Sequence, residues 1–465
     1  MTKITRYMAL ALVAVFCGCS GVKGLKPAEV AEGMPAEWAG MRATDSLTMA
    51  DMGWWEMYTD TTLVSIIRQT LDNNRDMLKA AARVEELRQL YGVTKLNYTP
   101  EITADAYANR ETNDYNGNNY VNDPETGVKV SLAWEMNLWG ALTWSQRSAK
   151  ANYMASVEDC RAMRMTLVAE VASAYFRLVA LDNELAIVRR TLVTRKEGVD
   201  QARLRFEGGL TSETVYQQAQ VEYATTAALV PNLEMQIAAA RNAITLLMGE
   251  YPDIRLDRGH LSPESLVPPT LPVGLPSELL QRRPDIRAAE QRLQGAMANV
   301  GLTYADRFPR LRLALSAGVE NDGFGKMFES PFTYMAGSLA GSVFDFGRKK
   351  RRYKASIAAY DQARFAYEQT VLTAFSEVST AITAFRKVQE TAHLKLSLRD
   401  AARKYVDLAH LQYRAGSLNY LDVLDAQRRY FDAQIGLSNA VRDEYLAIVS
   451  LYKTLGGGWQ VEDAR

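Results

Sequence analysis

The segment VKVSLAWEMNL, residues 128–138, alternates apolar and polar side chains along its whole length. Because successive side chains of a β-strand point to opposite faces of the sheet, this period of two predicts a strand with one apolar and one polar face. Its length of about ten residues is also that of a strand that crosses a lipid bilayer. A half-buried strand of a soluble sheet alternates in the same way, so the pattern alone leaves both interpretations open.

The chain repeats itself at an offset of 207 residues. The pairs that keep this register are Trp139 with Phe346, Gly140 with Gly347, Glu170 with Glu377, Gly209 with Gly416 and Gly249 with Gly456. Nearer the start of each copy the offset is 209, as for Pro100 and Pro309. This register indicates two long copies of one structural unit rather than a short-period solenoid.

Each copy predicts a helix, then a pair of strands, then a very long helical run without proline that ends at a glycine turn. The expected parts are a signal peptide at 1–18, an N-terminal arm at 19–61, repeat 1 at 62–249, a proline-rich linker at 250–276, repeat 2 at 277–457 and a tail at 458–465. We expect strands at about 100–138 and 309–346, helical hairpins at about 141–249 and 348–457, and loops at 113–126 and 321–330 between the strands. Pro231 should kink or break the return helix of the first hairpin.

The first twenty residues have the features of an export signal. Lys3 and Arg6 precede an apolar run of about ten residues, which is too short to span a bilayer and suits a signal peptide. The run ends at Gly18 and Cys19 and resembles a bacterial lipoprotein signal, in which the cysteine after a small residue becomes lipidated. An ordinary cleaved signal with an incidental cysteine is the alternative.

Composition excludes several other functions. The chain of 465 residues carries 54 basic and 54 acidic side chains without a basic excess, so a nucleic-acid partner is not expected. Its three histidines lie far apart in the sequence, so we expect no metal site and no cofactor. No residues suggest an enzyme.

Four strands are too few to enclose a barrel in lipid, which needs about eight or more. In lipid every backbone N–H and C=O must be paired, so an open sheet edge is excluded. If the strands lie in a membrane, several identical chains must therefore pool them. The argument predicts a homo-oligomer and does not choose between a dimer and a trimer.

The chain resembles the outer-membrane efflux proteins of the TolC-like family, in the lipid-anchored branch that serves resistance-nodulation-division pumps. The matching motifs are RRPDIRAAE at 282–290, FDFG at 344–347, YxxG at 413–416 and LDVLDAQ at 421–427. The resemblance covers essentially the whole mature chain. It implies a mixed α and β fold made mainly of long α-helices, in which each chain of a homotrimer gives four strands to a transmembrane β-barrel and two hairpins to a periplasmic α-helical barrel. It also implies a lipid-anchored outer-membrane location, a periplasmic adaptor protein and an inner-membrane pump as partners.

Asp422 and Asp425 are the candidate gate residues. They lie three residues apart and so share a helix face, and carboxylates in the first turns of a helix are also favoured by its dipole. The resemblance implies that they line the narrow periplasmic end, where three copies would form a ring that attracts cations. It also implies that Tyr413 ties the coils shut, although Leu418 replaces the arginine found near this tyrosine in some members.

The hairpin turns are the candidate contacts for the adaptor. They comprise Gly209, Leu210 and Thr211 in the first copy and Gly416, Ser417 and Leu418 in the second. Glycine suits the left-handed geometry of a tight helix end, and we expect Leu210 and Leu418 to be exposed on the tips. The expected function is a passive exit duct for small toxic compounds. A duct for type I protein secretion and a periplasmic helical scaffold without a pore are the alternatives.

Overall fold

The computed structural model describes residues 25–28, 38, 48–58, 60–114, 120–252, 258–259, 272–342 and 344–459. The expected signal peptide, the lipidation site Cys19 and most of the expected linker lie outside these residues. Two compact units divide the chain. The first contains residues 83–157 and 288–369 with the N-terminal 29 residues, and the second contains residues 30–82, 158–287 and 370–465.

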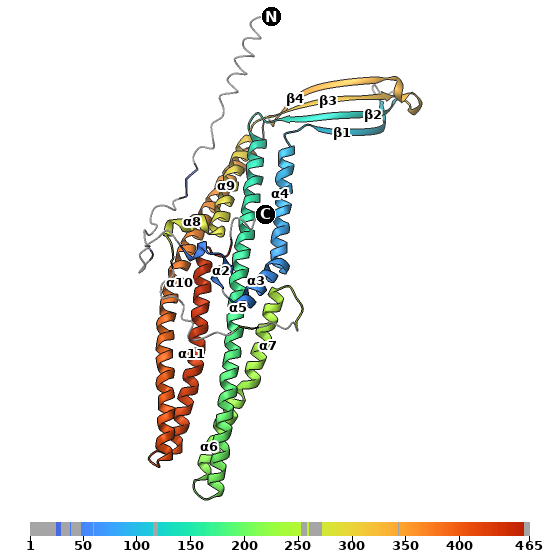
Figure 1. The fold of residues 1–465 in the computed structure, drawn as a ribbon. Coiled ribbons are helices and arrows are strands. Elements are labelled where there is room, and N and C mark those ends of the chain that lie inside the picture. The colour runs from blue at the N-terminus through green and yellow to red at the C-terminus, as the bar shows by residue number, and fades with distance from the viewer. Residues whose placement is uncertain are drawn as a thin grey trace. The chain divides into compact units, whose positions relative to one another are not determined.

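The first unit holds a four-stranded antiparallel sheet in the order β1-β2-β3-β4 (Figure 1). The strands are β1 (Glu101–Asp114), β2 (Tyr120–Met136), β3 (Arg310–Asn321) and β4 (Pro331–Ala340). β2 of the first repeat pairs with β3 of the second, which leaves β1 and β4 as the two edges. The two repeats therefore share one sheet.

The two faces of this sheet differ in polarity, as the alternation predicts. One cross-strand row on the apolar face contains Ile102, Leu132, Leu315 and Met335. Ile102 is 70% exposed and Met335 is 85% exposed, so none of the described residues covers this face at its two edges. On the other face the hydroxyls of Ser131 and Ser316 lie 3.0 Å apart.

All four strands meet the helices at the same end of the sheet, which we call the helical end. Glu101 at the start of β1 pairs with Ala133, and Arg310 at the start of β3 pairs with Ala340 at the end of β4. The helices joined here are α4 (Arg75–Leu96), α5 (Ala141–Glu207), α9 (Pro284–Ala305) and α10 (Arg348–Arg414). At the opposite end of the sheet Asp114 pairs with Tyr120, and Val319 pairs with Pro331.

Of the two expected loops, the one at 113–126 was wrong in extent, whereas the one at 321–330 matches the connection between β3, which ends at Asn321, and β4, which begins at Pro331. β1 continues to Asp114 and β2 begins at Tyr120, so most of the first segment is strand, because cross-strand pairing such as Glu111 with Asp123 outweighs the low strand propensity of its Asn and Asp residues. The second segment contains a short 3-10 helix, η3 (Phe324–Glu329), in which Met327 is buried.

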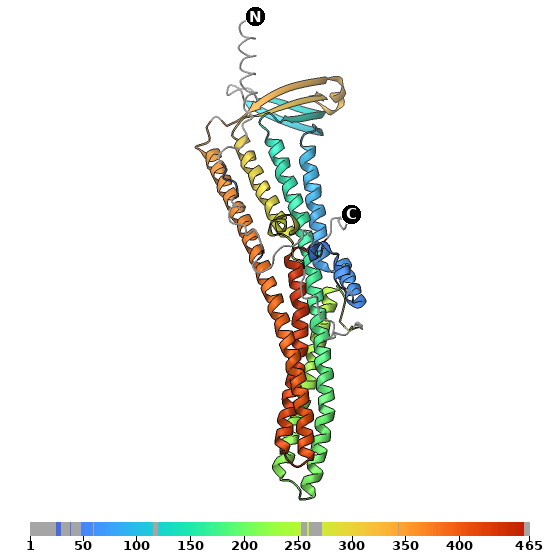
Figure 2. The ribbon, with the colours of Figure 1, turned by 60° about the vertical axis from the view of Figure 1, so that its left-hand side comes forward.

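The second unit consists of helices. Besides its parts of α4, α5, α9 and α10 it contains η1 (Met49–Asp51), α2 (Trp54–Met57), α3 (Thr61–Asn73), α6 (Glu213–Ala227), α7 (Leu229–Leu247), η2 (Pro276–Glu278), α8 (Leu279–Arg282) and α11 (Tyr420–Thr454). In this unit α10 and α11 lie side by side (Figure 1; Figure 2). No helix among the described residues is both long and apolar enough to cross a membrane.

The internal repeat is visible in the backbone. α5 and α10 have 67 residues each, and both start one residue after a glycine with positive φ. The glycines that end the helices, Gly209 with Gly416 and Gly249 with Gly456, also have positive φ. Residues that carry a side chain rarely adopt a positive φ, which is why glycine recurs at each matched position.

Pro231 separates α6 from α7, as its sequence predicts. The break falls at Ala228, and Pro231 is the third residue of α7. A proline at this position has no N–H to donate to the carbonyl four residues earlier, so the helix is interrupted. The equivalent return helix of the second repeat, α11, is continuous.

Candidate gate and hairpin tips

Each hairpin ends in the same turn. Gly209 N donates to Phe206 O and Leu210 N donates to Arg205 O, and in the second hairpin Gly416 N and Ser417 N donate to Tyr413 O and Gln412 O. This pair of bonds satisfies the last carbonyls of α5 and α10. The tips are therefore rigid turns rather than open loops.

The two tips differ in what they expose. Leu210 is 80% exposed, as expected. Leu418 is half-buried and packs against the buried cluster of Ala409, Val423 and Ala426, so the expectation that it is exposed was wrong. Its neighbours come from both α10 and α11, a tertiary contact that the sequence of the turn does not indicate. Only the first tip presents a free apolar side chain.

Asp422 and Asp425 lie in the first turns of α11, and both are half-buried. The carboxylate of Asp425 forms ion pairs with Arg428 at 2.6 Å and Arg429 at 2.7 Å. The hydrogen bond from Arg429 is the main cause that holds the pKa of Asp425 below its usual range, with Arg428 adding to it. Asp422 forms no ion pair within the part of the chain that the structure describes. The two carboxylates therefore differ, because one is compensated within its own helix and the other is not.

Arg428 and Arg429 were not identified from the sequence as partners of Asp425. Residues three and four positions apart face each other on a helix, and RR at 428–429 stands at these distances from Asp425. This spacing was the available signal.

Tyr413 is joined to α5 of the first hairpin. The guanidinium of Arg205 donates a hydrogen bond to the Tyr413 hydroxyl, and its central carbon lies 5.1 Å from the centre of the Tyr413 ring. The rings of Tyr413 and Tyr420 lie 5.4 Å apart. Arg205 thus contacts Tyr413 from the other hairpin of the same chain, although the arginine that the family pattern places near this tyrosine is Leu418 here.

A buried ion pair holds the first hairpin together. Arg195 on α5 lies 2.8 Å from the Glu222 carboxylate on α6, and its side chain is only 6% exposed. It also donates to the hydroxyl of Thr226 and lies over the ring of Phe431 on α11. These contacts fix the packing of α5 against both return helices. No group of His, Cys, Asp or Glu among the described residues has an arrangement that would hold a metal ion.

Known proteins match this chain along most of its length. Residues 66–250 and 275–457 match the family described as outer membrane efflux protein. The pyoverdine export outer membrane protein OpmQ of Pseudomonas putida is 28% identical over 463 residues, which cover 98% of this chain and 97% of OpmQ. The toluene efflux pump outer membrane protein TtgF, also from Pseudomonas putida, is 29% identical over 471 residues, which cover 98% of this chain and 97% of TtgF. Among solved structures, the outer-membrane channel OprN gives a TM-score of 0.86 at 29% identity over 95% of this chain and 99% of that chain.

Proposed function

Because the chain belongs to the outer membrane efflux protein family, we propose that three copies form a passive duct that crosses the outer membrane and continues into the periplasm. The observation that carries this proposal is the sheet with two unpaired edges, β1 and β4, and one exposed apolar face. Unpaired backbone groups are excluded from lipid, so β1 of one copy pairs with β4 of the next. Pairing around three copies closes the sheet.

The duct needs partners because it contains no source of energy. A periplasmic adaptor contacts the tips, where Gly209, Leu210 and Thr211 present the exposed leucine, and Gly416, Ser417 and Leu418 form the second turn. An inner-membrane pump of the resistance-nodulation-division class drives export. The protein has no catalytic role of its own. Its relatives of similar identity are named for different cargoes, pyoverdine and toluene, which supports a duct whose cargo is chosen by the pump.

The gate lies at the start of α11. Three copies of Asp422 bring three uncompensated carboxylates toward one axis, which attracts cations. Asp425 acts differently, because it neutralises part of the charge of Arg428 and Arg429. Tyr413 and Arg205 keep the two hairpins of one chain together in the closed state.

Lipidation of Cys19 anchors the N-terminus. The hydroxyl of Tyr360 donates to the carbonyl of Lys26 at 2.8 Å, so residues 25–28 of the arm contact α10. Tyr360 lies about 18 Å along α10 from its start at Arg348. The seven residues from Cys19 to Lys26 span at most about 25 Å, which exceeds the distance along α10 from Tyr360 to its start. Mass spectrometry of the N-terminal peptide tests the lipidation, and an unmodified Cys19 would contradict it.

Conductance in planar lipid bilayers tests the duct and the gate together. We expect the purified protein to give small, cation-selective channels that divalent cations block. Asp422→Ala should weaken the block by divalent cations, because a carboxylate without an ion pair is lost from each chain. Asp425→Ala should shift selectivity toward anions, because it leaves two arginines uncompensated.

The matched control uses the equivalent positions of the first repeat, where Val215 and Gln218 stand in place of the two aspartates. Val215→Ala and Gln218→Ala should leave selectivity and block unchanged. A protein that gives no channels would support the scaffold without a pore and would end the proposal. If all variants form channels that divalent cations block equally, the proposed duct stands and the proposed gate role of Asp422 and Asp425 is wrong.

A further inference from the structure

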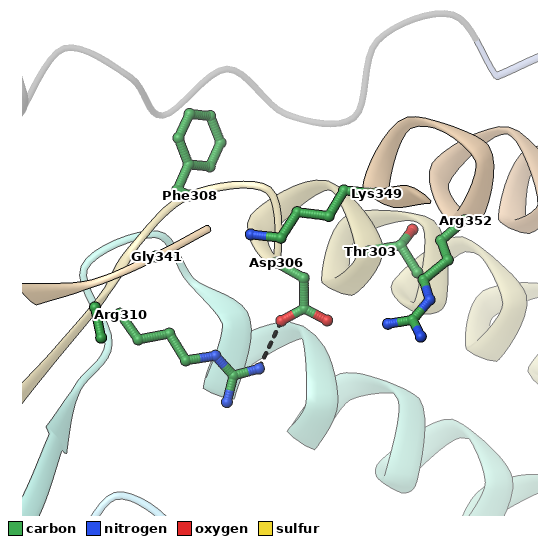
Figure 3. A pocket seen from close by; sticks show the side chains of 8 residues that line it. Thr303, Asp306, Phe308, Arg310, Gly341, Lys349 and Arg352 are labelled. Carbon is green, nitrogen blue, oxygen red and sulfur yellow. Dashed lines mark hydrogen bonds and ion pairs between the residues drawn. The ribbon is translucent and has the colours of Figure 1, made fainter. Parts of the chain in front are cut away.

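A cavity of about 230 Å³ lies at the helical end of the sheet in the first unit. It is smaller than the roughly 300–1,000 Å³ of pockets for drug-sized ligands, so it suits a small chemical group. Its charged lining comes from three elements: Asp306 follows α9, Arg310 starts β3, and Lys349 and Arg352 lie in the first turns of α10. Figure 3 shows these side chains around one space.

The cavity carries an excess of positive charge. Asp306 is its one carboxylate, and Arg310 forms an ion pair with it at 2.7 Å (Figure 3). Within the described ranges, neither the ammonium of Lys349 nor the guanidinium of Arg352 forms an ion pair. Two cationic groups therefore line the cavity without an ion pair of their own, although Asp345, just before α10, attracts Lys349 electrostatically.

The fold does not need these cations. The first repeat has Leu142 and Ser145 at the positions of Lys349 and Arg352, and α5 starts there as a helix of the same length. Cations at the N-terminus of a helix oppose its dipole, so they cost stability unless an anion accompanies them. The segment RKKRRYK at 348–354 contains six cationic side chains. The equivalent segment of the first repeat, ALTWSQR at 141–147, contains one. Asp345 caps the helix by accepting from Gly347 N and Lys349 N, which leaves the side chain of Lys349 available to a ligand.

Aromatic side chains in the connection from β4 to α10, just before Lys349 in the sequence, point to a membrane surface. Phe344 and Phe346, which connect β4 to α10, are 75% and 86% exposed, and their rings lie 4.6 Å apart. Phe346 has a φ of 54°, a strained geometry for a bulky residue, and it is followed by Gly347 at 82°. Exposed aromatic residues at the end of membrane strands are typical of the boundary between lipid tails and headgroups.

We propose that this cavity binds the phosphate of an anionic phospholipid from the periplasmic leaflet of the outer membrane, through Lys349, Arg352 and Arg310. This inference rests on the proposed function, in which the sheet lies in the membrane and the helices project into the periplasm. The helical end of the sheet is then at the height of the inner headgroups. The phosphate pairs with Lys349 and Arg352, the two cations that form no ion pair among the described residues, while Phe344 and Phe346 face the acyl chains. Among the described residues the first repeat lacks both cations, so the proposed site belongs to the second repeat.

The test measures phospholipid binding to delipidated protein in a neutral detergent. Phosphatidylglycerol should raise the thermal unfolding midpoint and remain bound in native mass spectrometry. The double variant Lys349→Leu with Arg352→Ser installs the residues of the first repeat. It should unfold at an unchanged or higher temperature without lipid, and its affinity for phosphatidylglycerol should fall by at least tenfold.

Lys350→Ala with Arg351→Ala is the matched control, because it removes two charges from the same turn without changing the cavity lining. The control variant should keep most of the affinity for phosphatidylglycerol. An equal loss of affinity in both variants would show that general surface charge, and not this cavity, binds the lipid. Sodium phosphate should not reproduce the stabilisation, and an equal effect of phosphate would overturn the lipid assignment. Unchanged affinity in the Leu–Ser variant would refute the site. If that variant does not fold, the double variant Lys349→Gln with Arg352→Gln replaces it in the same affinity measurement, with the same expected loss.

Discussion

The two helical hairpins have the same length to the residue but differ in their interiors. α6 and α7 together span 213–247, and α11 spans 420–454, which is the same interval shifted by 207. Arg195 and Glu222 form a buried pair in the first hairpin, where the second has Ala402 and Arg429. The glycine turns fix the length of a hairpin, whereas the residues between them are free to differ. A residue that is present in one repeat and replaced in the other is not required by the shared fold. Such positions are therefore where we look for functional differences.

The largest expected effect concerns the buried pair of the first hairpin. Arg195→Leu removes the buried guanidinium and leaves the Glu222 carboxylate, which is 26% exposed, without its partner. Loss of a hydrogen bond to a charged group costs roughly 1.5–3 kcal/mol. The thermal unfolding midpoint, followed by helical circular dichroism at a fixed heating rate, measures this loss.

Arg189→Leu is the control for that variant. Arg189 also joins α5 to a glutamate of the return helix, Glu234 at 2.8 Å, but both side chains are more than half exposed. Exposed pairs contribute about 0–1 kcal/mol, so this change should matter little. Equal losses in the two variants would show that burial does not distinguish the pairs.

The next effect concerns a buried carboxyl group in the second hairpin. Glu444 is 5% exposed and stands where the first repeat has the buried Ile237. Burial raises the pKa of Glu444, and His393 and Gln389 oppose this rise only in part. Glu444→Ile should therefore stabilise the protein at neutral pH by about 1–2 kcal/mol.

The pH dependence gives the sign of this effect. A group whose pKa is raised on folding favours the folded state most below its ordinary pKa, here 4.5, and less as pH rises through the folded value. The gain of Glu444→Ile should therefore be largest at neutral and alkaline pH and shrink toward pH 4.5. Glu444→Gln separates charge from packing. A gain independent of pH would show that the carboxyl charge is not its source.

Local rules predicted the backbone well and the contacts between segments poorly. The alternation from Val128 and the glycines at offset 207 gave the strands and the ends of the long helices, because both are set by neighbouring residues. The burial of Leu418 and the approach of Arg205 to Tyr413 depend on which helices pack together, so a single sequence carries little sign of them. The partners of Asp425 are an intermediate case, since their spacing on the helix was readable.

A smaller effect concerns the contact between the hairpins. The first repeat has Phe206 at the position of Tyr413, so Tyr413→Phe installs the residue of the other copy and removes the oxygen that accepts from Arg205. Loss of one hydrogen bond costs about 1 kcal/mol, which corresponds to about a fivefold change in the ratio of closed to open channels. Channel recordings measure this ratio. Arg205→Leu should change the ratio of closed to open channels in the same direction, and the double variant should change it little further. Fully additive effects would show that the two residues act independently.

The smallest effect concerns the proline that interrupts the first return helix. Ser438 of the continuous helix α11 is the counterpart of Pro231, and its hydroxyl accepts from the side chain of Asn183 at 3.0 Å. Pro231→Ser restores a donor toward the carbonyl of Ala227 and should join α6 and α7 across Ala228. The flanking helices already form, so the gain should stay below about 1 kcal/mol, the value of one hydrogen bond. Hydrogen exchange is the suitable measurement, because it reports each amide: exchange should slow at 228–232 and stay unchanged at the equivalent amides of α11. If the amides at 228–232 exchange as fast as before, the break is set by packing around Ala228, and the proline is accommodated at a bend that the fold would form without it.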